Sequence, residues 1–334
     1  MKEFKVGILG ATGVVGQEMM KILVERDFPV SELRPIASAR SAGKEIEFKG
    51  QNVKIVEAKD GAFDGLDIVL GAAENDIAIE MAPFIKKAGA LFIDNSSAFR
   101  LNEDVPLVVP GINSQDAFNN NGIISNPNCV TIITLMAIAP IAKMSKINTL
   151  IASSYQAVSG AGAKGLAELE KQSMDYANGK ELEVNAFAHQ ILFNLIPKIG
   201  GVGENGYSSE EMKLQNEGRK IMHLPEMKVN CTCVRVPVLR SHAISATLVT
   251  DEKLDLDEVR KNIAAFEGDV LFDDPSKEEY PMPLITSDQD KVYVGRIRRD
   301  LINENGITLW CCGDQIRKGA ATNAVQIAEL FKED

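Results

Sequence analysis

Long apolar runs are missing from this 334-residue sequence. No window approaches about 18 consecutive apolar residues, so we expect no membrane-spanning helix. The start, MKEFKVGILGATG, has a short apolar run that ends in a glycine-rich turn and not in a cleavage site, so we do not expect a signal peptide. No block of lysine and arginine provides a phosphate-backbone footprint, and the net charge of −11 repels nucleic acid and anionic membranes. We therefore expect neither as a partner.

Cysteines are few and lack the spacing of a zinc site. Among the five, Cys231 and Cys233 alternate along a strand-like run and Cys311 and Cys312 are adjacent, so neither pair has CxxC spacing. Because of this spacing we expect no metal site. An odd number of cysteines in a long chain indicates reduced thiols, so we expect a cytoplasmic protein. The length predicts about two domains, and the hydrophobic and charged fractions of 45% and 25% are ordinary for a globular enzyme.

The N-terminal segment has the order strand, glycine-rich turn and helix. An apolar run at 4–9 precedes GATGVVG, and apolar residues at helical spacing follow at 17–26. Gly10 and Gly13 allow the backbone to turn tightly and approach a pyrophosphate, and Gly16 allows the helix to pack closely on the strand. The helix N-terminus then presents N–H groups to the phosphates. The pattern indicates a dinucleotide site; a tight turn without a ligand is the alternative.

The end of the next strand indicates which dinucleotide binds. The strand at 33–38 leads into SARSAGK, where a site for NAD usually has an acidic residue. Arg40 and Ser41 occupy that place with Lys44 nearby, and a guanidinium there can pair with a 2′-phosphate. We therefore expect NADP; Arg40 as a solvated loop cation is the alternative.

Strand-like runs at 66–73 and 90–97, with a helical stretch between them, continue the alternation of strands and helices. This predicts an α/β fold whose first domain is a Rossmann-type parallel sheet with helices on both faces and ligands at the carboxyl ends of its strands. Arg100 follows one such end, in NSSAFR, and is a candidate anion contact or else a surface arginine.

Cys129 follows a short strand at 122–125 and the turn Asn-Pro-Asn, and it precedes the apolar helical run VTIITLMAIAPI. The positive end of a helix dipole stabilises a thiolate, which is the nucleophilic form. Cys129 is therefore either a nucleophile or a small buried hydrophobe. We expect the domain boundary close to it, which would put the thiol in an interdomain cleft.

The second half predicts a helix over 208–223. Ser208 or Ser209 is its expected cap. Glu210 and Lys213 are three residues apart and share one face, which by spacing alone favours a solvated ion pair.

Strands dominate the rest of the second half. The segment 229–251 reads as two alternating strands joined by a bend at Pro237, with Arg235 before the bend and His242 after it. Two more strands follow, and this antiparallel-looking series suggests an α+β domain whose sheet is large enough for a dimer face. A last helix at 319–333 has an apolar stripe and could return to the first domain.

Taken together and in order, several segments resemble one family over essentially the full length of the chain. They are GATGVVG, SARSAGK, DNSSAFR, NPNC, YQAVSGAG, EEMK, VRVPVLRSHA, VGRIRRD and KGAATNAVQIAE. The family is aspartate-semialdehyde dehydrogenase, and the short loops resemble the branch found in Gram-positive bacteria and some others.

The resemblance implies reversible, NADPH-dependent conversion of L-aspartyl 4-phosphate to aspartate 4-semialdehyde and phosphate. This is the step toward lysine, methionine, threonine and diaminopimelate. It implies that Cys129 is the nucleophile that forms a thioester, that His242 is the general acid/base and that Gln156 orients the intermediate. It also implies a homodimer or a dimer of dimers.

The resemblance assigns binding residues as well. Arg235 is expected to bind the substrate carboxylate and Glu210 the amino group, although Glu211 beside it could take that role. The implied phosphate contacts are Arg100, Asn128 and Lys213. The implied NADP contacts are Gly10, Thr12, Gly13, Val14, Val15, Arg40, Ser41, Ser159, Gly160 and Asn323. The expected domains are 1–128, joined by the C-terminal helix 315–334, for NADP binding and 129–314 for catalysis and dimerisation.

Three other functions compete with this one. N-acetyl-γ-glutamyl-phosphate reductase uses the same thioester chemistry, but its thiol segment usually has Gly where Asn128 stands, and an acylated amine gives Glu210 nothing to bind. Glyceraldehyde-3-phosphate dehydrogenase has a Ser-Cys-Thr-Thr-Asn-Cys context that is absent here. A non-catalytic NADP-binding redox regulator would need Cys129 but not the charged residues of the second half.

Overall fold

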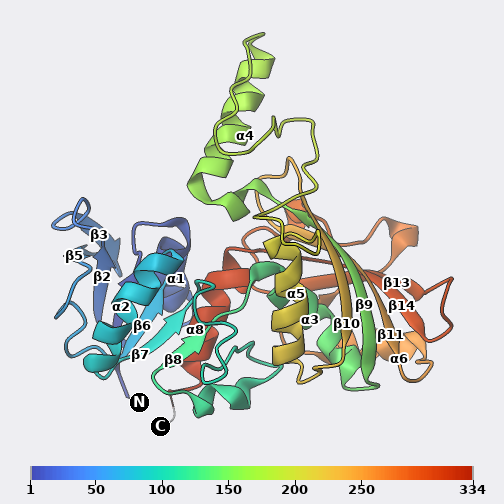
Figure 1. The fold of residues 1–334 in the computed structure, drawn as a ribbon, viewed down its shortest axis with the longest axis horizontal. Helices are drawn as coiled ribbons and strands as arrows, with labels where there is room; N and C mark the ends of the chain where they lie inside the picture. Colours follow the sequence, from blue (N-terminus) through green and yellow to red (C-terminus); the bar gives the residue numbers. More distant parts are fainter. Residues whose placement is uncertain (1, 333–334) are drawn as a thin grey trace. The chain divides into compact units, whose positions relative to one another are not determined.

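The computed structural model describes residues 2–332, which form two compact units (Figure 1). The first unit runs through Asn128 and resumes at Ala320, and the second runs from Cys129 to Gly319. Each unit has its own six-stranded sheet. No helix in the described part of the chain is long and apolar enough to cross a membrane.

The first unit is built on a wholly parallel sheet with the strand order β5-β2-β1-β6-β7-β8. This confirms the predicted parallel α/β domain. Its strands are β1 (Phe4–Leu9), β2 (Val30–Ala37), β5 (Val56–Glu57), β6 (Ile68–Gly71), β7 (Leu91–Asp94) and β8 (Ile123–Ser125). Its other elements are α1 (Val14–Glu25), the hairpin β3 (Glu45–Phe48) with β4 (Gln51–Lys54), α2 (Asn75–Lys87), η1 (Ser114–Asn119) and α8 (Thr322–Glu329).

Two hydrophobic clusters cover the two faces of this sheet because its buried strands are apolar on both sides. Side chains from β1 such as Val6 and Ile8 pack with α1 and α8, while Val69 and Phe92 pack with α2. The chain end thus contributes to the core of the first unit, since α8 contacts α1, β6 and β7.

The second unit has a mixed sheet with the order β10-β9-β11-β14-β13-β12. Its strands are β9 (Ile147–Gln156), β10 (Lys228–Arg235), β11 (His242–Thr250), β12 (Asp269–Leu271), β13 (Val292–Arg299) and β14 (Gly306–Gly313). Its helices are α3 (Cys129–Ala142), η2 (Val158–Ala161), α4 (Gly162–Ala177), α5 (Ser209–Ile221), α6 (Leu256–Ala265), η3 (Pro275–Lys277) and α7 (Pro283–Thr286). The π-helical η4 (Arg317–Ala321) begins in this unit and ends in the first. The helices α3, α5 and α6 pack on this sheet, and α4 extends away from it (Figure 1).

Two predictions about the second half need correction. The sheet is not purely antiparallel, because β10 pairs with β9 in parallel and β12 pairs with β13 in parallel. The segment between β9 and β10 contains α4 and α5, and such a helical crossover returns the chain in the same direction. The last helix does not begin as an α-helix at 319, since Arg317–Ala321 is π-helical and α8 starts at Thr322.

Candidate active site

The glycine loop of the first unit has the close backbone approaches that a dinucleotide site needs. Gly10 has φ +85°, and a Cβ there would lie 2.5 Å from the carbonyl oxygen of Ala72. A Cβ on Gly16 would collide with the carbonyl oxygen of Gly10. The cap of α1 is Gly13, no side chain caps the helix, and its first turn has no acidic residue. The residues present therefore fit a pyrophosphate at the start of α1.

Arg40 and Ser41 lie in the turn that follows β2. The N–H of Ser41 donates to the carbonyl oxygen of Ser38 (2.9 Å), which closes the turn, and Arg40 is exposed on it. An exposed guanidinium beyond the second strand fits a 2′-phosphate and provides no acceptor for a ribose hydroxyl.

Arg100 is buried and held by backbone carbonyl groups. Its Nε donates to the carbonyl oxygen of Asn126 (2.9 Å) and its Nη2 to that of Asn95 (2.6 Å). Asn126 is in turn fixed by Asn323, whose Nδ2 donates to Asn126 Oδ1 (2.7 Å). Asn128 is also buried. Arg100 is thus a positioned cation near the end of β7 and not a solvated surface arginine.

Cys129 is the first residue of α3, where the sequence places it, and it is partly exposed. Gly319 packs against it, since a Cβ on that glycine would lie 2.9 Å from the Cβ of Cys129. The remainder of α3 is buried from Val130 to Ile141, which explains its uniformly apolar sequence. The helix therefore presents one reactive group, at its N-terminus.

Gln156 and Glu210 meet in the interior of the second unit. Gln156 Nε2 donates to Glu210 Oε1 (3.2 Å), and Lys213 Nζ donates to Glu210 Oε2 (2.9 Å). The Glu210 side chain is only 9% exposed, so this pair is not the solvated ion pair that spacing alone favours. Ser154 is the neighbour of Gln156 on the same face of β9, and its Oγ donates to Gln156 Oε1 (3.0 Å). The amide of Gln156 is thereby held in one orientation.

Glu211 binds backbone N–H groups and not the side chains that Glu210 contacts. Its Oε2 accepts the N–H of Ser208 (2.7 Å), which completes a capping box at the start of α5. Its Oε1 accepts the N–H of Cys233 on β10 (3.1 Å). Both oxygens are therefore engaged by backbone groups, which leaves Glu210 as the carboxylate beside Gln156.

Arg235 and His242 converge on the turn after β9. A Cβ on Gly160 would lie 2.7 Å from Arg235 Nη1 and 3.3 Å from His242 Nε2. Arg235 Nη1 donates to the carbonyl oxygen of Ala157 (2.6 Å), and the N–H of Ala157 donates to His242 Nδ1 (3.1 Å). Burial and then the charge of Arg235 lower the pKa of His242 to about 3, while Glu210 and the Ser241 backbone act in the opposite direction. The histidine is therefore neutral at physiological pH.

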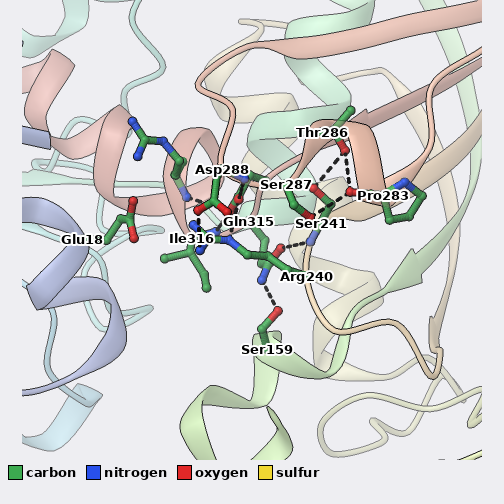
Figure 2. Close-up of polar contacts among 12 residues, drawn as sticks. Glu18, Ser159, Arg240, Ser241, Pro283, Thr286, Ser287, Asp288, Gln315 and Ile316 are labelled. Atoms are coloured by element: carbon green, nitrogen blue, oxygen red, sulfur yellow. Dashed lines mark hydrogen bonds and ion pairs between the residues drawn. The ribbon is translucent and has the colours of Figure 1, made fainter. Parts of the chain in front are cut away.

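Sequence analysis did not identify Ala157, Ser154 or Gln315. Gln315 Oε1 accepts the N–H of Ser241 (2.8 Å), its Nε2 donates to Ser159 Oγ, and Ser241 precedes His242 with φ +72° (Figure 2). The position of Ser154 two residues before Gln156 was a usable signal, because alternate strand residues share a face. Ala157 acts through its backbone, which no side-chain pattern reveals.

Two family models match this chain. "Semialdehyde dehydrogenase, NAD binding domain" covers residues 5–120, and "Semialdehyde dehydrogenase, dimerisation domain" covers residues 138–318. The chain is therefore an oxidoreductase of the semialdehyde dehydrogenase class, with a dinucleotide-binding domain and a domain that forms dimers.

Curated relatives and solved structures narrow the class. The aspartate-semialdehyde dehydrogenase of Aquifex aeolicus (strain VF5) is 45% identical, over 99% of this chain and 98% of the relative, and that of Bacillus subtilis (strain 168) is 43% identical over 98% and 97%. The structure of aspartate semialdehyde dehydrogenase II from Vibrio cholerae, complexed with ASA, matches with a TM-score of 0.97 at 41% identity, covering 100% of this chain and 99% of the other. The Candida albicans enzyme with NADP matches with a TM-score of 0.77 at 25% identity, covering 99% of each chain.

The chain belongs to the aspartate-semialdehyde dehydrogenase family, whose members are NADP-dependent, phosphorylating oxidoreductases. This confirms the resemblance seen in the sequence and the expected cofactor, and it does not support the reductase or regulator alternatives.

Proposed function

We propose that this chain catalyses the reversible, NADPH-dependent reductive dephosphorylation of L-aspartyl 4-phosphate to L-aspartate 4-semialdehyde, in the biosynthesis of lysine, methionine, threonine and diaminopimelate. The observation that supports this most is the set of buried groups in the second unit. A guanidinium, a carboxylate and an amide, from Arg235, Glu210 and Gln156, suit the carboxylate, the amino group and the acyl oxygen of a small amino-acid substrate.

In the proposed reaction, Cys129 supplies the nucleophile. The thiolate sulfur attacks the acyl carbon, the carbon–oxygen bond to phosphate breaks, and a thioester forms as phosphate leaves with the bonding electrons. When bound, NADPH supplies the hydride that reduces this thioester. Collapse of the resulting thiohemiacetal breaks the carbon–sulfur bond and releases the aldehyde. His242 serves as the acid–base group at the acyl oxygen, and Gln156 orients the intermediate.

The remaining groups bind and orient. Arg235 donates two parallel hydrogen bonds to the substrate carboxylate, a bidentate arrangement that a lysine cannot form. Glu210, and not Glu211, receives the amino group. The phosphate contacts that we propose are Arg100, Asn128 and Lys213. The ten residues that the resemblance implies as NADP contacts remain proposals, supported by the glycine loop and the exposed position of Arg40.

Dependence on phosphate tests this function directly. Purified protein with aspartate semialdehyde and NADP⁺ is expected to produce NADPH, followed by its absorbance, beyond one equivalent per active site only when phosphate or arsenate is added, because the thioester needs an oxyanion acceptor before the next turnover. N-acetyl-glutamate semialdehyde serves as the matched control substrate and should be unreactive. Equal rates with and without the oxyanion would rule out the acyl-phosphate assignment.

Arg40 is expected to determine the preference for NADP over NAD. Replacing Arg40 with alanine should raise the KM for NADP⁺ by about tenfold while leaving the KM for NAD⁺ nearly unchanged, because only NADP⁺ carries the 2′-phosphate. Lys44→Ala, an exposed cation of the same turn, is the comparison. If wild-type enzyme used both dinucleotides with equal efficiency, Arg40 would not read the phosphate.

We also propose a homodimer, or a dimer of dimers, that works in the cytoplasm. The match to a dimerisation domain supports the dimer. None of the five cysteines forms a disulfide within the described residues, in keeping with a reducing compartment.

A further inference from the structure

The guanidinium of Arg235 lies over the ring of Phe187 in the second unit. The Cζ atom of Arg235 is 5.9 Å from the centroid of the ring. Phe187 belongs to the segment between α4 and α5, which is neither helix nor strand around this residue. A cation is attracted by the negative face of an aromatic ring, and the attraction is larger when the cation is removed from water. Arg235 is only 6% exposed, so the ring is placed where it stabilises the charge.

The segment that carries this ring is fixed although it is irregular. On one side of the ring, Oε2 of Glu168 accepts the N–H of Asn185 (2.8 Å) and also the N–H of Ala186. On the other side, Oε1 of Gln172 accepts the N–H of Leu192 (3.0 Å). Glu168 and Gln172 are four residues apart on one face of α4, and both are buried. Moving the segment would leave a buried carboxylate without its donors, which is costly.

The helix α4 and the strand β10 also restrict the position of the ring. A Cβ on Gly165 would lie 3.1 Å from Cζ of Phe187, so the glycine lets the ring edge approach α4 closely. Further along the segment, the N–H of Ile196 donates to the carbonyl oxygen of Arg235 (3.0 Å), and the N–H of Arg235 donates to the carbonyl oxygen of Ile196 (2.9 Å). The segment that carries the ring is thus hydrogen-bonded to the backbone of the arginine itself.

Two groups of the protein therefore hold the Arg235 side chain. Its Nη1 donates to the carbonyl oxygen of Ala157 (2.6 Å), and its guanidinium lies over the ring of Phe187. Because a guanidinium is planar and rigid, a fixed Nη1 and a neighbouring ring together restrict the directions of its other N–H groups. In the proposed function, those N–H groups donate to the substrate carboxylate.

We propose that Phe187 is a positioning residue for Arg235: its ring holds the guanidinium in the orientation that binds the substrate carboxylate, and so contributes to the selection of semialdehydes that carry this carboxylate. This rests on the proposed function, in which Arg235 binds that group. The competing explanation is that Phe187 only fills space, since it also packs against a buried apolar cluster that includes Val158, Leu169 and Ile191. The two explanations differ in whether the charge distribution of the ring matters.

Two replacements separate charge from shape. Phe187→Leu keeps an apolar side chain and removes the ring. Phe187→3,5-difluorophenylalanine keeps the ring and its para position, which faces Gly165, and weakens the negative charge of the ring face. We expect the KM for aspartate semialdehyde to rise by about tenfold in the first variant and about threefold in the second, with kcat nearly unchanged, because the interaction lost is common to substrate and transition state. The KM for NADP⁺ should not change.

A control variant and a control substrate complete the experiment. Phe193→Leu makes the same change at an exposed ring of the same segment, which lies against Tyr176, and should leave the KM unchanged. The control substrate, 3-aminopropanal, is the semialdehyde without its carboxylate, and its kcat/KM should be the same in wild type and in both Phe187 variants.

An unchanged KM for aspartate semialdehyde in the difluoro variant would overturn the proposal, because the shape is kept and only the charge of the ring differs. An equal loss with 3-aminopropanal would overturn it as well, since that substrate gives Arg235 no carboxylate to bind. Wild-type protein without activity on aspartate semialdehyde would refute the proposed function and this proposal together, whereas the two outcomes above refute this proposal alone.

Discussion

Replacing Cys129 with alanine is expected to lower kcat for semialdehyde oxidation by roughly 10⁴-fold or more, because no thioester forms without the sulfur. NADPH affinity should change little, since the glycine loop that fits the pyrophosphate belongs to the first unit. The rate is followed by NADPH absorbance, and the affinity by fluorescence titration of NADPH. Substantial turnover by this variant would remove Cys129 from its role.

The other thiols provide the control for this experiment. All four are buried, whereas Cys129 is partly exposed. Burial raises the pKa of Cys312 to about 12, and the hydrogen bond with Cys231 together with burial raises the pKa of Cys233. We expect Cys231→Ser to retain activity, and iodoacetamide to alkylate Cys129 first, with activity lost in parallel. Inactivation that tracks labelling of Cys312 instead would contradict the assignment.

Much of the local structure was predictable because each helix or strand follows from the pattern of residues close together in the sequence. The strand 4–9 and the apolar helix after Cys129 follow from runs of buried residues, and the structure has β1 and α3 there. The start of α5 was predicted with Ser208 or Ser209 as its cap, and in the structure the cap is Ser208, which forms a capping box with Glu211. Patterns of this kind depend on neighbours in the chain, so a single sequence is sufficient to read them.

Long-range pairing was not predictable by the same means. The alternation of residues along β10 is the same whether it pairs in parallel or antiparallel with β9, so the mixed sheet did not follow from it. The choice between Glu210 and Glu211 also depends on distant partners. Glu211 is held by the N–H of Cys233, and Glu210 faces Gln156, and both partners lie on other elements.

Gly160 is the position where the smallest change should have a large effect on the second unit's site. A glycine in a loop usually indicates a backbone conformation with positive φ, which other residues rarely adopt. Gly160 has no positive φ, so this is not the reason for a glycine here. The reason lies in space: an added Cβ would lie 2.7 Å from Arg235 Nη1 and 3.3 Å from both Cε1 and Nε2 of His242. Arg235 donates a hydrogen bond to the carbonyl oxygen of Ala157, and the N–H of Ala157 donates to His242. Neither side chain can move away from the added Cβ without losing its hydrogen bond to Ala157.

We therefore expect Gly160→Ala to lower kcat/KM for the semialdehyde by roughly 10²-fold, since displacing a binding or reacting group by about 1 Å has this effect. The loss of stability should be the smaller effect, because the added methyl group meets polar atoms of the buried Arg235 and His242 side chains and displaces no apolar core residue. Gly201→Ala is the matched control, as Gly201 has no positive φ and nothing within 4 Å of its Cβ position. Equal effects of the two substitutions would mean that Gly160 does not act by leaving room for Arg235 and His242. A loss confined to Gly160→Ala, with the KM for NADP⁺ unchanged, ties activity to the position of those two side chains and not to the NADP contact proposed for Gly160.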